Sequence, residues 1–397
     1  MIRLRFPRFS RTIKEMGIIL LLSSLGFAFA GSIMSIYINS FVHSDSLVGF
    51  VFTGLVCLSI LVHFFIIPYI EKGNKSRIYF VSSILVAIGY FLYYLIGNFY
   101  LFLAVAAIVT ILITFKITTG GLLVEHYSNK RNLSKNEGVM YTFIDLAWII
   151  GPLIAGLVLS QWGEKPVFLF ASVFMLLSGI AILLFNINYS GKVKKSHDGV
   201  LKNFYEFFKD KNRLKSYLLG AGSNFWWSFV FVYIPLLIIK YFKDSSVGYF
   251  IFFAMLPLIL LQYYFGKLTG KIGYKKIFFI GYLIPGILAI LCFFIPNIWF
   301  ILTAVCLASI GLAMTEATSE SYFFDILKPG EDERFYAPYN TAVDAGNLTG
   351  ELICAVLLIF LPFKSIFIVY GVGMISLSIL SLSIKEIIES KRNGKFK

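Results

Sequence analysis

The sequence contains little charge and little cysteine. Only 14% of its 397 residues are charged, and its four cysteines are Cys57, Cys292, Cys306 and Cys354. Each cysteine falls inside an apolar segment, where a thiol acts as a small apolar side chain, so a disulfide framework is excluded. Hydrophobic residues make up 58% of the chain, more than the core of a water-soluble protein can bury. The composition therefore predicts an integral membrane protein.

The sequence also lacks the signatures of common enzymes. It contains no P-loop, no CxxC pair, no Ser-His-Asp set and no cluster of metal-ligating residues. We therefore expect no enzymatic activity, no cofactor and no metal site.

Long apolar runs recur along the whole chain. A helix needs about 20 apolar residues to cross a bilayer. Runs of suitable length fall at residues 16–41, 47–70, 78–97, 100–124, 138–161, 166–188, 214–240, 246–265, 276–295, 298–322, 335–361 and 364–385. The first run is too long for the core of a cleaved signal peptide. Alternating segments typical of membrane β-barrels are absent. The sequence predicts an all-α integral membrane protein with twelve transmembrane helices.

Lysine and arginine indicate how these helices are oriented. With the N-terminus inside the cell, 30 of the 35 cations fall in inside segments and 4 in outside loops, with Lys116 left within a helix. Cytoplasmic loops carry such an excess of Lys and Arg. We therefore expect a protein of the cell membrane with both termini cytoplasmic. The net charge of +14 then reflects topology and contact with anionic lipids rather than binding of nucleic acid.

The chain contains an internal repeat with an offset of 199 residues. The segment Asp45–Phe50 (DSLVGF) corresponds to Asp244–Tyr249 (DSSVGY). Further matched pairs are Asn98 with Asn297, Asp145 with Asp344, and Gly151 with Gly350. The repeat predicts two pseudo-symmetric six-helix bundles, residues 1–188 and 214–397, joined by a cytoplasmic linker at 189–213. Residues 203–209 of the linker have the pattern of a short amphipathic helix on the membrane surface, and a solvated linker is the alternative.

Two parallel six-helix halves with such a linker resemble the major facilitator superfamily over the whole chain. Three motifs support this resemblance, the first common to the family and the other two similar to its twelve-helix drug/proton antiporters. The first is the loop between the second and third helices of each half. It includes Gly266, Gly273, Lys275 and Lys276 in the second half, and Glu71 and Lys72 in the first. The resemblance implies a tight turn whose charges hold helix ends together on the inner face, and an ordinary positively charged cytoplasmic loop is the alternative.

The second motif lies on the fourth helix. Drug exporters of the family have R-x-x-Q-G there, and this chain reads KITTG from Lys116 to Gly120. A cation within an apolar helix is costly and is usually functional or paired. A role for Lys116 in proton coupling or substrate binding, and an ion pair with Asp145 on the fifth helix, both remain open.

The third motif lies on the fifth helix. Its positions hold Gly138, Ala147, Gly151, Pro152, Ala155 and Gly156, with the two alanines replacing glycines of the antiporter pattern. The small residues four positions apart allow another helix to approach closely, and Pro152 can bend the helix. The resemblance implies antiport, and ordinary small-residue packing is the alternative.

The tenth and eleventh helices carry acids far from either membrane surface. Asn340, Asp344, Asn347 and Glu351 share one helical face, and Glu316 and Glu320 lie on the preceding helix. At 1.5 Å per residue, Asp344 lies about 13 Å and Glu351 about 24 Å into a core about 30 Å thick. A charge facing lipid there costs at least about 3 kcal/mol. We therefore expect the face to contact protein or a water-filled cavity.

These acids suit proton coupling. Carboxyl groups that lie close together in a medium of low dielectric cannot all be ionised, so at least one is expected to hold a proton near neutral pH. The alternative is a structural role, in which the acids pair with each other and with asparagines.

The resemblance also implies that the first, fourth, seventh and tenth helices line a central cavity. The candidate lining residues are Asn39, Lys116, Asn224, Trp227 and Glu316, with Asn340 and Asn347 on the eleventh helix. An aromatic cavity with net negative charge favours lipophilic cations.

The expected function is secondary active transport by alternating access. We expect a monomer that exports amphipathic or cationic small molecules in exchange for protons. The alternative is a proton- or sodium-coupled symporter that takes up a sugar, peptide or amino acid. A receptor or lipid-handling scaffold that transports nothing has no need of membrane-buried acids, so the acids argue against it.

Overall fold

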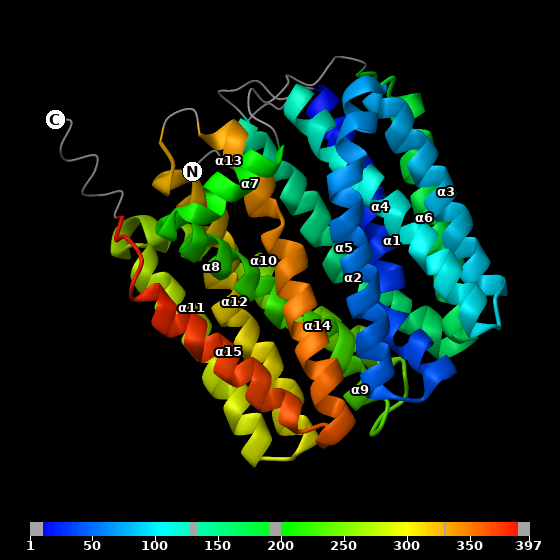
Figure 1. The fold of residues 1–397 in the computed structure, drawn as a ribbon. Coiled ribbons are helices and arrows are strands. Elements are labelled where there is room, and N and C mark those ends of the chain that lie inside the picture. The colour runs from blue at the N-terminus through cyan, green and yellow to red at the C-terminus, as the bar shows by residue number, and fades with distance from the viewer. Residues whose placement is uncertain (1–10, 128–132, 190–199, 329–330, 388–397) are drawn as a thin grey trace, which may run out of the picture. The chain divides into compact units, whose positions relative to one another are not determined.

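The computed structural model describes residues 11–127, 133–189, 200–328 and 331–387, and every regular element within them is a helix (Figure 1). The helices up to the linker are α1 (Arg11–Val42), α2 (Asp45–Lys72), α3 (Lys75–Leu95), α4 (Phe99–Tyr127), α5 (Leu133–Trp162) and α6 (Glu164–Leu184). The later ones are α7 (Val200–Lys209), α8 (Lys211–Ser228), the π-helix η1 (Phe229–Tyr233), α9 (Ile234–Ile238), α10 (Ser246–Ile272), α11 (Tyr274–Phe294), α12 (Ile298–Ile326), α13 (Asp332–Asn340), α14 (Ala342–Phe360) and α15 (Ser365–Ser381).

The apolar helices confirm the predicted membrane spans. Among the described residues, 11 helices are long and apolar enough to cross a membrane, and the shorter apolar helix α15 follows them. α8, η1 and α9 together form one span, Lys211–Ile238, and α13 with α14 forms another, Arg334–Phe360. The predicted class, an all-α membrane protein with twelve transmembrane helices, is confirmed.

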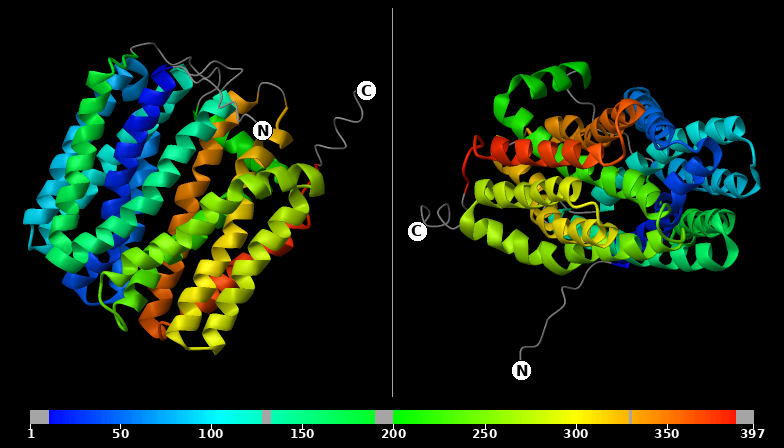
Figure 2. Two further views of the ribbon diagram at one scale, coloured as in Figure 1. Left: turned by 180° about the vertical axis from the view of Figure 1, so that it is seen from behind. Right: turned by 90° about the horizontal axis from the view of Figure 1, so that it is seen from below.

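The chain divides into two compact units. The described parts of residues 1–33 and 61–193 form one unit, and those of 34–60 and 194–397 form the other. The residues of α1 and of α2 are therefore each divided between the two units. Figure 2 shows the helices from two further sides. The predicted bundle and linker boundaries at residues 188 and 214 stay a prediction.

The internal repeat reappears in the helix boundaries. Both ends of α3 recur 199 residues later in α11, and the same holds for α4 and α12. The capping residues recur as well, because the first N–H groups of a helix need an acceptor. Asn98 Oδ1 accepts from the Leu101 amide at 3.1 Å before α4, and Asn297 Oδ1 accepts from the Trp299 amide at 2.9 Å before α12.

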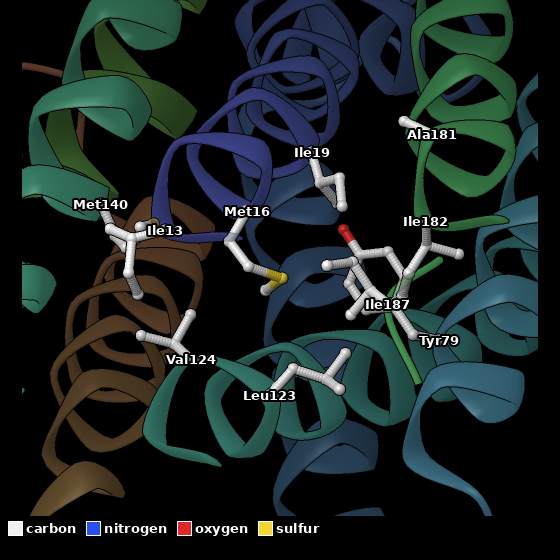
Figure 3. Close-up of a cluster of buried hydrophobic side chains, with 10 residues drawn as sticks. All are labelled: Ile13, Met16, Ile19, Tyr79, Leu123, Val124, Met140, Ala181, Ile182 and Ile187. Carbon is white, nitrogen blue, oxygen red and sulfur yellow. The ribbon is translucent and has the colours of Figure 1, made fainter. Parts of the chain in front are cut away.

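The first unit has a continuous apolar core. Ile13, Met16 and Ile19 on α1 pack with side chains of α3, α4, α5 and α6 (Figure 3). The pairs α3–α6 in the first unit and α11–α15 in the second approach closely through small residues. Ser172 Oγ donates to Ala87 O at 2.7 Å, and Ser378 Oγ donates to Phe279 O at 2.8 Å.

All four cysteines are free thiols. Cys292 and Cys354 are buried, as a packing role requires, whereas Cys57 is exposed on the surface of its helix.

Two of the predicted helices are interrupted. The run at 335–361 breaks at Thr341. Pro338, three residues earlier and inside α13, has no backbone N–H to donate to the helix. Thr341 Oγ1 donates to Pro338 O at 2.7 Å and satisfies a carbonyl at the break. The run at 214–240 contains the π-helix η1, which ends two residues before Pro235. Wide turns and broken helices of this kind are frequent at functional sites.

Candidate functional site

Lys116, on α4, is buried inside the first unit with 1% of its surface exposed. Its Nζ donates to Ser23 Oγ on α1 and, at 3.1 Å, to Tyr79 OH on α3. The rings of Phe27 and Tyr79 lie 5.0 and 4.5 Å from Nζ. Hydroxyls and aromatic rings therefore surround this cation, and within the described residues no ion pair joins it to the half-buried Asp145.

The hydroxyls around Lys116 continue as a chain. Tyr79 OH is hydrogen-bonded to Ser178 Oγ at 3.0 Å, and Ser178 Oγ donates to Ile19 O at 3.0 Å. The sequence analysis missed Ser23, Tyr79 and Ser178. They lie on three different helices, and no spacing within one helix marks them.

The small residues of α5 face α1. A Cβ at Gly151 would lie 2.6 Å from Ala28 Cβ, and Ala147 and Ala155 are fully buried. The close helix contact that the fifth-helix motif predicts is therefore present, with Gly156 buried and Pro152 inside the helix. The role of this motif in antiport stays a prediction.

The loop motif forms a sharp turn in the second unit. Gly273 ends α10 and precedes α11 with φ +89°, a value that favours glycine. A Cβ at Gly266 would meet open space, so that glycine lies in an uncrowded stretch of α10. Tyr274 OH donates to Asp325 Oδ2 at 2.9 Å and joins the start of α11 to the end of α12.

The charged residues of this motif lie at helix ends. Lys275 is half-buried and Lys276 is exposed in the first turn of α11. In the first half, Glu71 and Lys72 are the last two residues of α2.

Glu316, on α12, accepts hydrogen bonds from two other helices. Trp227 Nε1 on α8 donates to Oε1, and Gln262 Nε2 on α10 donates to Oε2 at 3.3 Å. The Trp227 ring lies 5.9 Å from that of Phe231. A half-buried carboxylate beside aromatic rings can attract an organic cation.

The predicted acids do not all gather in one place. Glu320, one turn beyond Glu316, accepts instead from Tyr336 OH of α13 at 2.8 Å. Asp344 and Glu351 lie seven residues apart on one face of α14. The structure thus gives Glu316 and Glu320 separate partners and keeps Asp344 and Glu351 two turns apart on a third helix.

Glu351 lies in the interior of the second unit with 4% of its surface exposed. Its Oε2 atom is buried and has no hydrogen-bond partner among the described residues. Its backbone oxygen accepts from Tyr233 OH of η1 at 2.7 Å.

Two glycines bring this part of α14 close to α8. A Cβ at Gly346 would collide with the backbone oxygen of Ala221 and lie 2.9 Å from the Phe225 amide nitrogen. A Cβ at Gly350 would collide with Ser228 Oγ and lie 3.2 Å from the backbone oxygen of Phe225, both on α8. The sequence pointed to Gly350 only through the repeat, because the neighbours that require a glycine belong to another helix.

The first turns of α2 pack beside Glu351 within the second unit. Asp45 forms an ion pair with Lys240, and Ser46 Oγ donates to Ala355 O at 2.7 Å. Gly49 faces Tyr233 and Ala355, and a Cβ there would lie 2.9 Å from Ala355 Cβ.

The predicted asparagines keep their side-chain amides available. Asn39, Asn224 and Asn347 are half-buried and Asn340 is exposed. None of the four makes a side-chain hydrogen bond to another residue in the described part of the chain.

The fold and its interior define a multi-pass membrane protein with polar and charged groups buried among its helices. A sequence profile described as Major Facilitator Superfamily matches residues 16–256 and 217–396. The chain belongs to the Major Facilitator Superfamily of transporters. The resemblance found in the sequence is confirmed at this level, and membership of the drug/proton antiporter group stays a prediction.

Individual relatives are distant. An uncharacterized MFS-type transporter of Methanocaldococcus jannaschii is 27% identical over 262 residues, which cover 63% of this chain and 66% of that protein, just under two thirds. The solved structures similar to this one include a POT family transporter in complex with a thioalcohol-conjugated peptide (12% identity) and one in complex with 5-aminolevulinic acid (13% identity). Both have a TM-score of 0.76 and cover 94% of this chain and 95% of theirs, so they share its fold.

Proposed function

We propose that this protein is a secondary active transporter that couples proton movement to the passage of a small solute by alternating access. Glu351 carries the proposal. Its Oε2 is buried without a hydrogen-bond partner among the described residues. A buried ionised carboxylate without compensation costs several kcal/mol, whereas a protonated carboxyl is tolerated. Glu351 therefore holds a proton in this conformation.

The contacts of α2 supply the switch that proton release needs. The ion pair that holds Asp45 is partly exposed, with 46% of the Lys240 side chain accessible, and such pairs contribute at most about 1 kcal/mol. Separation of residues 45–49 from α14 would admit water to Glu351 and let it ionise. Protonation then favours the packed arrangement, and ionisation favours the separated one.

We favour export of amphipathic or cationic compounds. Glu316 offers a carboxylate that is held by Trp227 and Gln262 from two other helices. An organic ammonium group can replace these donors and gain both Coulomb attraction and contact with the Trp227 ring. Lys116 makes no ion pair among the described residues and remains a second candidate for coupling.

Uptake of a polar solute with protons or sodium is the second candidate. Asn224 and Asn347 have amides that make no hydrogen bond within the described chain, as recognition of a polar solute requires. The solved POT family transporters hold a peptide conjugate and 5-aminolevulinic acid on the same fold.

Neither form of transport requires a second copy of the chain. We propose a monomer in the cell membrane with both termini cytoplasmic, which binds substrate, protons and lipid and uses no cofactor, metal or nucleic acid. It catalyses no chemical reaction.

The test is exchange in proteoliposomes that contain a pH-sensitive dye. A gradient of a lipophilic cation is imposed on wild type, Glu351→Gln and, as a control, Asp244→Asn in the loop before α10. We expect proton movement opposite to the cation in wild type and the control, and its loss in Glu351→Gln. Absence of proton movement with any cation overturns export, and the same assay with peptides, sugars and Na⁺ then tests uptake.

A further inference from the structure

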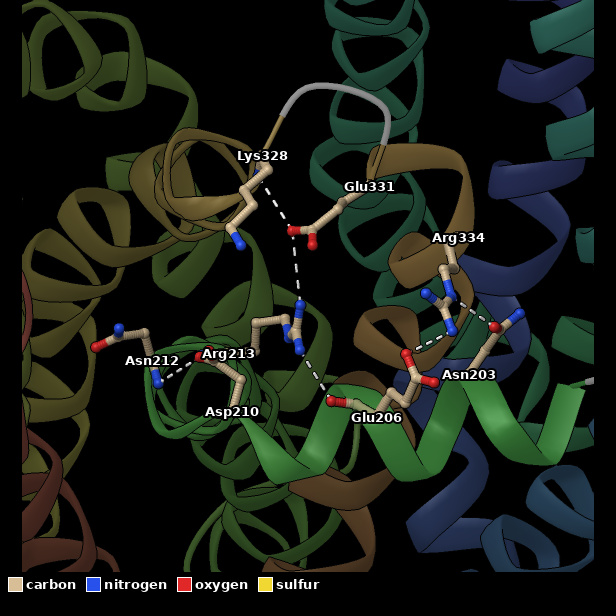
Figure 4. A network of polar contacts seen from close by, with 8 residues as sticks. All are labelled: Asn203, Glu206, Asp210, Asn212, Arg213, Lys328, Glu331 and Arg334. Atoms are coloured by element: carbon tan, nitrogen blue, oxygen red, sulfur yellow. Dashed lines mark hydrogen bonds and ion pairs between the residues drawn. The ribbon is translucent and has the colours of Figure 1, made fainter. Parts of the chain in front are cut away.

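The helix α7, in the segment between the two repeats, is held to the second unit along one face. Phe207 is fully buried in a cluster with Phe323, Phe335 and Tyr339. On the same side, Arg334 forms an ion pair with Glu206 at 2.5 Å and donates to Asn203 Oδ1 at 2.8 Å (Figure 4). The predicted segment is helical, and these contacts hold α7 against α13. Its place on the membrane surface stays a prediction.

A second connection ties α7 to the start of α8. Arg213 donates to the backbone oxygen of Glu206 at 2.9 Å and lies 3.6 Å from the carboxylate of Glu331 (Figure 4). Asp210 Oδ1 caps α8 by accepting from the amides of Asn212 and Arg213 at 2.8 and 3.0 Å. These contacts fix the orientation of α7 about its own axis.

The opposite side of α7 carries two exposed aromatic rings, of which Phe208 also lies 5.0 Å from the Tyr217 ring of α8. Tyr205 is 68% exposed and Phe208 is 37% exposed, and the two lie three residues apart on one face. Lys202 and Lys209, seven residues apart, border this face and are exposed. Lys211 adds another exposed cation just beyond Asp210. The helix therefore presents an aromatic strip beside a row of positive charges.

The position of α7 beside a membrane span indicates that lipid covers this aromatic strip. Only Asp210 separates α7 from Lys211, where a membrane span begins, so α7 lies at a membrane boundary. We propose that Tyr205 and Phe208 insert among the lipids of the adjoining leaflet while Lys202, Lys209 and Lys211 bind anionic headgroups. Aromatic rings prefer this interfacial depth, and lysines near an anionic surface each add attraction.

This surface has a consequence for the broken span. The lipid-facing strip and the ion pair with Arg334 lie on one rigid ten-residue helix. The leaflet thereby restrains the position of α13, the first segment of the span that continues into α14. Lipid charge in the leaflet would act on α13 through α7.

The test uses the full chain in bilayer nanodiscs, with the four native cysteines replaced by alanine. Nitroxide labels are placed at Tyr205→Cys and, in a second variant, at Lys209→Cys. Leu214→Cys on the exposed side of α8 is the membrane reference, and Lys243→Cys in an exposed loop is the aqueous reference. Electron paramagnetic resonance measures how strongly oxygen and a water-soluble nickel chelate relax each label.

We expect the label at 205 to resemble that at 214, with a severalfold larger ratio of oxygen to nickel accessibility than at 243. The depth should be about 5–10 Å below the headgroups. The ratio should fall when phosphatidylglycerol is replaced by phosphatidylcholine, or when Lys202 and Lys209 are changed to Gln. A label at 205 as open to nickel as that at 243 overturns the proposal, and so does one shielded from both reagents, which would indicate a protein contact.

Discussion

At the scale of residues, the interior holds two ionisable groups in different surroundings. Lys116 donates hydrogen bonds to two hydroxyls and lies beside aromatic rings. Glu351 has an unpartnered oxygen and lies beside two tyrosines. The first group has hydrogen-bond partners, whereas the second has a buried carboxyl oxygen without one, which is tolerated best when the carboxyl is protonated. We therefore propose Glu351 as the proton site.

Removal of the Tyr79 hydroxyl should destabilise the first unit. Tyr79→Phe keeps the ring but removes one hydrogen bond each from Lys116 and Ser178, which costs about 1–3 kcal/mol in a buried site. Tyr94→Phe, on the same helix and half-buried, is the matched control. Thermal unfolding in detergent should show a lower Tm for Tyr79→Phe alone, and equal midpoints would contradict the proposed hydroxyl network.

At the scale of elements, close contacts between helices position the site. Gly151 allows α5 to approach α1, and its equivalent Gly350 allows α14 to approach α8. α8 widens into η1 beside Glu351, and α13 breaks from α14 at Thr341. These irregular turns lie close to the acids. Local rearrangement at such turns disrupts fewer helical hydrogen bonds than rearrangement within a regular helix.

Filling the contact between α8 and α14 should be costly. Gly346→Ala places a Cβ against backbone atoms of Ala221 and Phe225, which cannot move aside as a side chain can. We expect a loss of about 1–3 kcal/mol in stability, the usual cost of overpacking. Gly266→Ala, where a Cβ meets open space, should be neutral or slightly stabilising. Matching unfolding curves for the two variants would refute the close approach.

Separation of α2 from α14 should expose a native thiol. Gly49→Val places methyl groups against Tyr233 and Ala355 and prevents residues 45–49 from packing. Cys354 is fully buried in this region. With the other three cysteines replaced, Cys354 should react with a small maleimide several times faster in Gly49→Val than in the parent. An unchanged rate would mean that α2 does not cover this site.

Hydropathy and charge were sufficient to predict the helices but not their interruptions. Long apolar runs and loop cations follow directly from the solvent that each segment meets, and the 199-residue repeat is visible in paired residues such as Asn98 and Asn297. The break at Thr341 and the π-helix before Pro235 lie inside apolar runs, where hydropathy does not distinguish them from regular helix. Likewise, the acids on α12 and α14 were found from their spacing, whereas their partners Gln262, Tyr336 and Tyr233 lie on other helices and leave no pattern within one segment.

At the scale of the whole molecule, the two repeats are equivalent in helices but unequal in chemistry. Asp145 corresponds to Asp344, yet the position that corresponds to Glu351 holds Pro152. The first repeat keeps a cation, Lys116, in its interior, and the second keeps the acids. The repeated architecture thus supplies two matched sets of helices, and a single repeat supplies the proposed proton site.

This asymmetry predicts unequal effects of equivalent substitutions. Asp344→Asn removes the charge that interacts with Glu351 and should shift the pH at which exchange is half-maximal. Asp145→Asn has no such neighbour among the described residues and should leave that pH unchanged. The measurement is initial exchange rate against pH in proteoliposomes, and equal shifts for both variants would contradict the assignment.

The central claim is that Glu351 carries a proton at neutral pH, and infrared difference spectroscopy tests it without knowledge of the substrate. Spectra of the protein in lipid are recorded while the pH is raised, for wild type and for Glu351→Gln. We expect wild type to show a carboxylic acid C=O band at neutral pH that disappears as the pH rises, and we expect the variant to lack that band. Identical spectra for the two proteins would show that Glu351 is already ionised and would contradict the account.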